Sequence, residues 1–200
     1  IYKKKKGYAE ARALKILVES PNVVKPKCNH FYICSKIQNL SYKEQLKEKG
    51  NQVIDAFQRL GGFKDFKLNN VVKGDPTFNY RNKMEFTFSP HRWVLDSEPE
   101  GVSKSFALGL HIPGRYDKIL DINNCYIQPE IGNKILKVAR EVCLSNPKLK
   151  PYDPKTHIGF LRYLMLRYGV KTGQLMVDSD DDPTYQIAVD YNVKTGVLAK

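Results

Sequence analysis

The side chains that could act as nucleophiles or metal ligands are four cysteines and four histidines. Cys28 and Cys34 are close in the sequence, whereas Cys125, Cys143 and the histidines are dispersed. The first residues run from a basic cluster into an amphipathic pattern, without the apolar stretch of a secretory signal. A disulfide framework is therefore not expected. From the residues alone, the simplest interpretation is that these cysteines are thiols packed in the interior.

The segment Tyr80–Phe88 could bind an anion. Its sequence, YRNKMEFTF, alternates strictly, so that its Met and Phe side chains would share one face of a strand. The opposite face would begin with Arg81 and Lys83. The pattern predicts a half-buried strand whose basic face is either solvated or in contact with a ligand.

The overall charge favours an anionic partner. The 200 residues include 33 Lys+Arg against 21 Asp+Glu, which gives a net charge of +12. Nucleic acid is the first candidate and an acidic membrane surface the second, and the 12 Tyr and 9 Phe among the basic residues favour nucleic acid. No stretch of the sequence approaches the roughly 18 consecutive apolar residues that a membrane-spanning helix needs. We expect the protein to be cytoplasmic.

The elements around these residues predict an α+β fold with mostly antiparallel strands and a few helices. One helix is expected from Ser41, where Ser41 and Glu44 form a capping box, to the glycine pair at 61–62. A second is expected from Pro129 to about Cys143. Strands are expected at 8–18, 67–72, 80–88, 105–112, 118–122 and, as a hairpin, 159–169 and 173–180, with strand character also at 185–191.

The sequence contains no recognisable catalytic motif. A Gly-rich dinucleotide loop, a Walker A pattern, a G-x-S-x-G elbow and an H-E-x-x-H pair are all absent. The residues alone therefore indicate a basic α+β module that binds nucleic acid.

A series of short stretches extends this interpretation. KKGYAEARALKILVESPNVVKPKC resembles the end of a small RNA-binding barrel, the TRAM domain, and CNHFYIC resembles a C-x-H-F-G-x-C motif. YKEQLKEKGNQVIDAFQRLGG resembles the helix that follows, and YRNKMEFTFS, LGLHIPGRYDKILDINNCYIQPE and HIGFLRYLMLRYGVKTGQLMV resemble pieces of a central domain. In this order, over nearly all of residues 3–178, they resemble the RNA uracil-5-methyltransferase family, which makes 5-methyluridine in ribosomal and transfer RNA with S-adenosylmethionine.

The resemblance implies a domain organisation. It comprises the C-terminal part of a TRAM-like barrel (1–24), a cysteine loop (25–40), a helix that would pack with the methyltransferase domain (41–62) and a central RNA-binding domain (63–200).

Family enzymes also carry a Rossmann-like domain with the methyl-donor loop, the cysteine that attacks C6 of uracil and the base that removes the C5 proton. None of these motifs occurs in the 200 residues, and Cys125 and Cys143 do not lie in the context of the catalytic cysteine. We therefore expect no catalytic residue and no Rossmann-like domain in this chain. S-adenosylmethionine would be bound by that missing domain, and the chain alone would be inactive.

Many family members also hold a [4Fe–4S] cluster through C-x5-C-x2-C and a distant fourth cysteine. Cys28 and Cys34 match the first two ligands and Cys125 matches the fourth, but Ile37 occupies the third position and cannot bind iron. We favour loss of the cluster. The alternatives are a three-cysteine cluster with an outside ligand such as His30, and a zinc site formed by the three cysteines with His30.

The resemblance places Arg81 near the target nucleotide, where a guanidinium can contact phosphate or stack on a base. Lys83 and Arg115 are weaker candidates, while Arg162 and Arg167 would be either paired in the interior or directed at an anion. The basic run Lys3, Lys4 and Lys5 would add salt-sensitive attraction to phosphate.

The expected partner is RNA, either rRNA or tRNA, with no membrane and no obligate protein partner. The alternative is a stand-alone RNA-binding module, or a degenerate Fe–S or zinc module, without catalysis.

Overall fold

The computed structural model describes residues 1–11, 13–95, 98–178, 191–192 and 197–198. The chain forms two compact units, and separate stretches of sequence contribute to each. The first unit contains Ile1–Pro26 and Lys36–Val71, and the second contains Lys27–Ser35 and Val72–Lys200.

The first unit begins with a short antiparallel hairpin, in which β1 (Lys3–Lys5) pairs with β2 (Tyr8–Glu10). The strand predicted over 8–18 extends only through β2, and the prediction is wrong for the described residues that follow. Leu14 and Val18 are 97% and 87% exposed there. An alternating pattern forms a strand only where a second strand supplies hydrogen bonds, and among the described residues none pairs with this stretch.

The helix predicted from Ser41 is confirmed as α2 (Tyr42–Asp55), which continues into a π-helical turn, η1 (Ala56–Leu60). The Ser41 Oγ accepts a hydrogen bond from the backbone N–H of Glu44 at 3.4 Å, as the capping pattern predicts. The helix ends at the predicted glycine pair.

The strand predicted over 67–72 is wrong, because this segment is irregular. Two of its apolar side chains, those of Leu68 and Val71, lie beside α2 instead. A Cβ placed on Gly50 would lie 3.5 Å from Leu68 Cδ2 and 3.4 Å from Val71 Cγ2. Leu68 and Val71 therefore contact a helix rather than completing a sheet.

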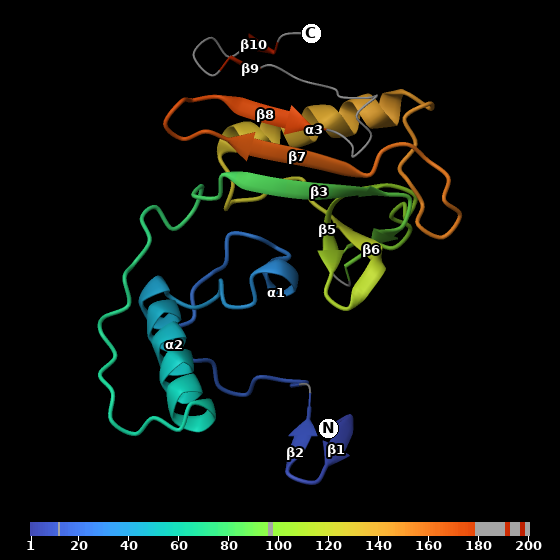
Figure 1. The fold of residues 1–200 in the computed structure, drawn as a ribbon. Helices are drawn as coiled ribbons and strands as arrows, with labels where there is room; N and C mark the ends of the chain where they lie inside the picture. Colours follow the sequence, from blue (N-terminus) through green and yellow to red (C-terminus); the bar gives the residue numbers. More distant parts are fainter. Residues whose placement is uncertain (12, 96–97, 179–190, 193–196, 199–200) are drawn as a thin grey trace. The chain divides into compact units, whose positions relative to one another are not determined.

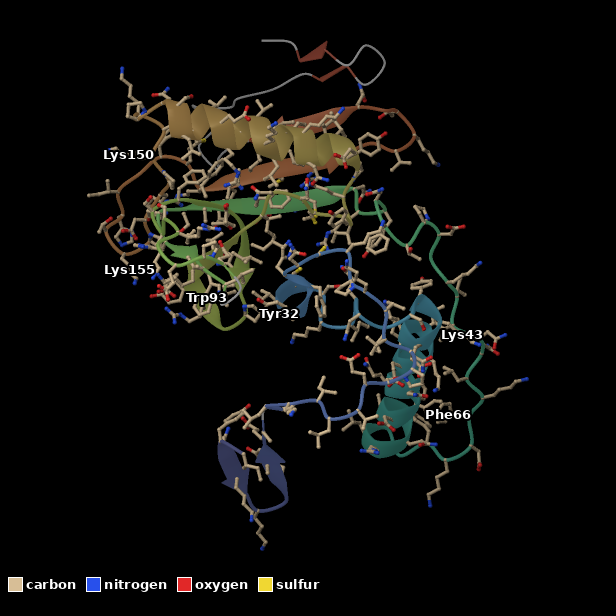
Figure 2. The ribbon with its side chains drawn as sticks, turned by 180° about the vertical axis from the view of Figure 1, so that it is seen from behind. Tyr32, Lys43, Phe66, Trp93, Lys150 and Lys155 are labelled. Atoms are coloured by element: carbon tan, nitrogen blue, oxygen red, sulfur yellow. The ribbon has the colours of Figure 1, made fainter. Side chains whose placement is uncertain are left out.

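The second unit is built on a six-stranded sheet in the order β4-β6-β5-β3-β7-β8. Neighbouring strands are antiparallel except β4 and β6, which are parallel, so the predicted α+β class with a mainly antiparallel sheet is confirmed. Helix α3 lies along one face of β7 and β8, as Figures 1 and 2 show from opposite sides. The elements are α1 (Phe31–Cys34), β3 (Lys83–Ser89), β4 (Arg92–Trp93), β5 (Ala107–Ile112), β6 (Arg115–Asp121), α3 (Glu130–Ser145), β7 (Tyr163–Tyr168) and β8 (Leu175–Asp178).

These elements confirm the remaining sequence-based predictions except at the C-terminus. The strand expected at 118–122 begins earlier, at the start of β6. The strand character expected at 185–191 falls almost entirely outside the described residues, and only its last residue belongs to β9 (Tyr191–Asn192), which pairs with β10 (Val197–Leu198).

Strand β3 shows the predicted alternation. Met84, Phe86 and Phe88 are 6%, 0% and 2% exposed and join the hydrophobic core, whereas Lys83 and Glu85 are exposed. Leucines of β7 and apolar residues of α3 pack into the same core. The sheet therefore buries one face of β3 and leaves the basic face at the surface.

Candidate nucleic-acid interface

Arg81 lies just before β3, where two hydrogen bonds fix its position. Its backbone N–H donates to the carbonyl of Ile127 at 2.8 Å, and its Nε donates to the carbonyl of Lys83 at 3.1 Å. The side chain is exposed, and no ion pair joins it to a carboxylate of the described residues. Arg81 can therefore offer the rest of its guanidinium to a ligand.

Two further cations lie beside it on the exposed face of the sheet. Lys83 is directly opposite Arg167 of β7 in the strand register, and both side chains are exposed. Lys83 Nζ lies 3.9 Å from Glu85 Oε2, but both side chains are about half exposed, at 50% and 47%, so this pair is weak. Arg167 is thus a surface cation rather than an interior one. We call Arg81, Lys83 and Arg167 the basic face.

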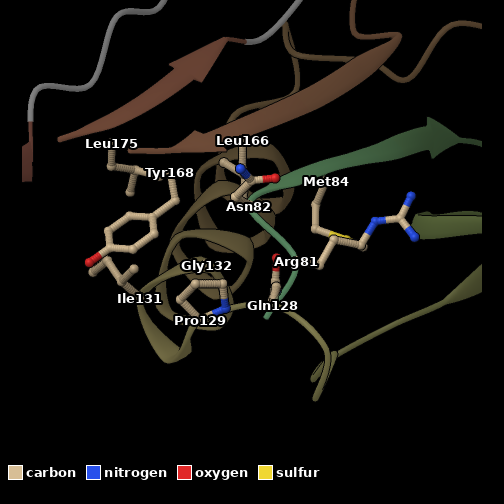
Figure 3. Close-up of a pocket in the computed structure, with 10 residues that line it drawn as sticks. All are labelled: Arg81, Asn82, Met84, Gln128, Pro129, Ile131, Gly132, Leu166, Tyr168 and Leu175. Atoms are coloured by element: carbon tan, nitrogen blue, oxygen red, sulfur yellow. The ribbon is translucent and has the colours of Figure 1, made fainter. Parts of the chain in front are cut away.

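A cavity next to Arg81 is too small to hold a nucleotide. Its volume is about 10 Å³, which is room for about one water molecule. Figure 3 shows the guanidinium of Arg81 extending away from the other lining residues. Inside, the buried Gln128 donates from Nε2 to Asn133 Oδ1 at 2.7 Å, while its Oε1 has no hydrogen-bond partner among the described residues. A ligand of Arg81 must therefore bind on the outer surface.

Arg115, the other predicted RNA contact of the second unit, is engaged within the protein. Its guanidinium donates to both carboxylate oxygens of Asp117, at 2.9 and 3.1 Å, and Lys155 Nζ lies 3.3 Å from the same carboxylate. The hydrogen bond from Arg115 is the main reason that the pKa of Asp117 lies far below its usual range. Asp117 is ionised at neutral pH, so its one negative charge offsets part of the charge of both cations.

The predicted lysines at the start of the chain lie in the first unit. Lys3, Lys4 and Lys5 form β1 and are exposed, and Lys3 Nζ makes a 2.9 Å ion pair with Glu10.

The structure brings the three predicted metal-ligating cysteines near one another in the second unit. Burial raises the pKa of the Cys34 thiol to about 11, and the nearby Cys28 and Cys125 add to the increase. Burial also raises the pKa of Cys125, and Arg81 partly offsets this increase. His30 Nδ1 lies 3.5 Å from Cys34 Sγ.

These residues do not fit a four-thiolate cluster. The third ligand position is Ile37, whose side chain has no donor atom for iron. Among residues 1–178 apart from the undescribed positions, no group of three or more His, Cys, Asp or Glu side chains is arranged to hold a metal ion.

Because Ile37 supplies no ligand at the third position, we predict that the folded chain, purified without oxygen, contains neither iron nor zinc at one atom per chain. Elemental analysis by mass spectrometry measures both. Stoichiometric iron would contradict this expectation and favour the three-cysteine cluster, and stoichiometric zinc would favour the set that includes His30.

Comparison with known protein sequences shows the family to which this chain belongs. An uncharacterized RNA methyltransferase of Chlorobaculum tepidum is 41% identical over 184 residues, covering 89% of this chain and 38% of the relative. One of Porphyromonas gingivalis is 38% identical over 186 residues, covering 88% of this chain and 40% of the relative. The chain belongs to the RNA methyltransferase family. The family resemblance of the sequence is thereby confirmed, although no family model matches the chain.

The fold agrees with that of a solved structure, the tRNA (uracil-54, C5)-methyltransferase of Pyrococcus abyssi in complex with S-adenosyl-L-homocysteine. The TM-score is 0.55 at 22% identity, and the match covers 91% of this chain and 36% of that protein. This chain thus spans about two fifths of the length of the RNA methyltransferases that it matches. None of the helices in the described part is long and apolar enough to cross a membrane.

Sequence reasoning missed a group of aromatic residues in this RNA methyltransferase chain. Tyr152 and Tyr163 lie close to Thr87 and His111, although the sequence separates them widely. The one available signal was Arg162, one of the two arginines of 159–169 whose role the sequence left open. In the structure it is exposed and its guanidinium lies 4.0 Å from the ring centre of Tyr152.

Proposed function

We propose that this chain is the RNA-binding central part of an S-adenosylmethionine-dependent RNA (uracil-C5)-methyltransferase that acts on rRNA or tRNA. The observation that carries the proposal is the basic face, where Arg81, Lys83 and Arg167 come together at the exposed side of a rigid sheet. The family membership and the net charge of +12 support it.

The three cations of the basic face have distinct chemical roles in this proposal. Lys83 and Arg167 neutralise phosphates of the RNA backbone and release bound counterions. Arg81 is planar, so it can also stack on an unpaired base or donate to its edge. This chain holds and orients the RNA. The methyl group comes from S-adenosylmethionine, which residues outside these 200 would bind, because the 200 residues contain no Gly-rich loop for it.

The same proposal assigns the other parts of the chain. Residues 1–24 are the end of a TRAM-like barrel, 25–40 are the cysteine loop, the helix of 41–62 packs with the Rossmann-like domain of the whole protein, and 63–200 bind RNA. Lys3, Lys4 and Lys5 add attraction to phosphate, and Arg115 contributes little because Asp117 engages it.

We predict that Arg81→Ala weakens binding of single-stranded tRNA and rRNA fragments by roughly 5- to 150-fold, which corresponds to about 1–3 kcal/mol. Fluorescence anisotropy at two salt concentrations measures the dissociation constant and its salt dependence, which should become less steep if phosphate contact is lost. The matched control is Arg59→Ala on η1, an exposed arginine 3.7 Å from Asp55, which should change affinity by less than about twofold. Equal affinities of the two variants would contradict the role of the basic face.

Methyl transfer itself is tested on the whole protein. With S-adenosylmethionine and tRNA or rRNA, mass spectrometry of the digested RNA should detect 5-methyluridine. A methyl group on another base, or none, would contradict the uracil-C5 assignment.

A further inference from the structure

A second hollow of the second unit differs from the small one beside Arg81. Its volume is about 240 Å³, and it opens between the sheet and the loop that connects α3 with β7, on which Figure 2 labels Lys150 and Lys155. We call it the tyrosine pocket, and the residues used below are His111, Tyr116, Tyr152, Arg162 and Tyr163.

The wall of the tyrosine pocket carries two planar groups in contact, the guanidinium of Arg162 and the ring of Tyr152. The guanidinium carbon of Arg162 lies 4.0 Å from the centre of the Tyr152 ring, a cation–π contact. The Tyr152 hydroxyl shares a 2.7 Å hydrogen bond with His157 Nδ1, which fixes the ring. Arg162 is exposed and has no ion pair with a carboxylate of the described residues, so its charge and outer face are open to a ligand.

The loop that presents this pair is held firmly. The carbonyl of Asp153 accepts a hydrogen bond from the backbone N–H of His157 at 2.8 Å, and the Asp153 N–H donates to the carbonyl of Ile158 at 2.8 Å. Asp153 Oδ1 also lies 3.1 Å from His91 Nε2, which ties the loop to the sheet. A platform that is ordered before binding loses little entropy on binding.

The floor and rim of the tyrosine pocket add polar groups and further rings. His111 Nε2 and Thr87 Oγ1 lie 3.2 Å apart, and both can hydrogen-bond to a flat ligand. Tyr163 is half-buried, and Tyr116 is 75% exposed at the rim. The pocket thus combines stacking surfaces, the cation Arg162, a few hydrogen-bonding groups and the carboxylate of Asp117, which is paired with Arg115.

We propose that the tyrosine pocket binds one unpaired nucleobase of the RNA, stacked against the Arg162–Tyr152 pair, at a place separate from the basic face. The inference rests on the proposed function, because it takes RNA as the partner. Unpaired bases are recognised by stacking on aromatic rings and guanidinium planes, with hydrogen bonds to the base edge. The chain has a net charge of +12, which favours binding of a negatively charged RNA segment over binding of a peptide with few acidic residues.

The test measures binding of a fluorescently labelled single-stranded RNA to the full chain. Tyr152→Ala should weaken binding by roughly 5- to 150-fold and leave the salt dependence unchanged, because stacking releases no counterions. Tyr152→Phe keeps the ring and loses only the contact with His157, so it should retain most of the affinity that Tyr152→Ala loses. Fluorescence of Trp93, the one tryptophan of the sequence, reports whether each variant folds.

A second measurement uses the unchanged chain and does not depend on any variant folding. RNA that carries 4-thiouridine is cross-linked to the chain by light, and the modified peptides are identified by mass spectrometry. Cross-links on the peptides of Tyr152 or Tyr163 support the tyrosine pocket.

The outcomes separate the two proposals. If RNA binds but Tyr152→Ala folds and binds as well as Tyr152→Phe, or cross-links occur only outside these peptides, the tyrosine pocket is overturned and the proposed function stands. If the unchanged chain binds no RNA even at low salt, the proposed function fails and the pocket assignment with it.

Discussion

Asp121→Ala is expected to lower the free energy of unfolding of the second unit by about 3–5 kcal/mol, since it leaves a buried cation without its counter-ion. Asp121 Oδ1 accepts from Arg140 at 2.7 Å and from the backbone N–H of Leu108 at 2.9 Å. The side chains of Arg140 and Asp121 are only 15% and 13% exposed. Urea unfolding followed by Trp93 fluorescence measures the change as a lower midpoint at an unchanged slope.

The position of Arg140 explains the size of this effect. Its guanidinium also donates to the carbonyls of Leu108 and Ile122, at 3.3 and 2.9 Å, so it joins α3 to β5 and to the end of β6. A second arginine, Arg92, lies 3.8 Å from the other oxygen of Asp121. Loss of the one carboxylate therefore affects two arginines and the contact between helix and sheet.

Two control variants distinguish the loss of the ion pair with Arg140 from a nonspecific loss of stability. Asp121→Asn keeps an acceptor for Arg140 and Leu108 and should cost less than Asp121→Ala. Glu141→Ala removes an exposed carboxylate of α3, 4.0 Å from Lys137 in the same unit, and should change stability by at most about 0.5 kcal/mol. Equal midpoints for Asp121→Ala and the unchanged chain would show that the buried carboxylate does not hold the helix to the sheet.

The parts of the fold that the sequence predicted are those that local chemistry decides. The alternation in β3 and the capping pair at the start of α2 involve neighbouring residues, and both predictions are confirmed. The segment 67–72 does not form a strand, because Leu68 and Val71 contact the helix that precedes it, and a local pattern cannot reveal which element a segment will contact.

The candidate site follows the same division. Arg81 was found from a short motif, and its neighbour Lys83 from the strand period. Arg167 became a member of the basic face only once the register of β7 against β3 was known. The tyrosine pocket combines residues from four strands, β3, β5, β6 and β7, and from a loop, so only the folded chain shows it.

Gly159→Ala is expected to lower stability by about 3 kcal/mol or more and to weaken RNA binding about as strongly as Tyr152→Ala. Gly159 has φ +115°, which side-chain-bearing residues rarely adopt, and a Cβ there would lie 2.2 Å from the carbonyl oxygen of Pro151 and 2.6 Å from Tyr152 Cα. The backbone that carries the Tyr152 ring must therefore move to admit a methyl group. Urea unfolding and the anisotropy assay measure the two effects on one protein preparation.

Gly173→Ala is the matched control, because it introduces the strain of a positive φ without the steric clash that an added Cβ would cause at Gly159. Gly173 has φ +69°, and a Cβ there would meet no atom within 4 Å, so its cost is about 1–2 kcal/mol of backbone strain alone. It lies in the turn between β7 and β8, away from the residues that line the tyrosine pocket, and RNA affinity should stay within about twofold. If both variants lost the same stability and the same affinity, the close approach of Gly159 to Pro151 and Tyr152 would not shape the pocket. If Gly159→Ala alone lost RNA affinity while remaining folded in dilute buffer, the loop geometry would be directly linked to base binding.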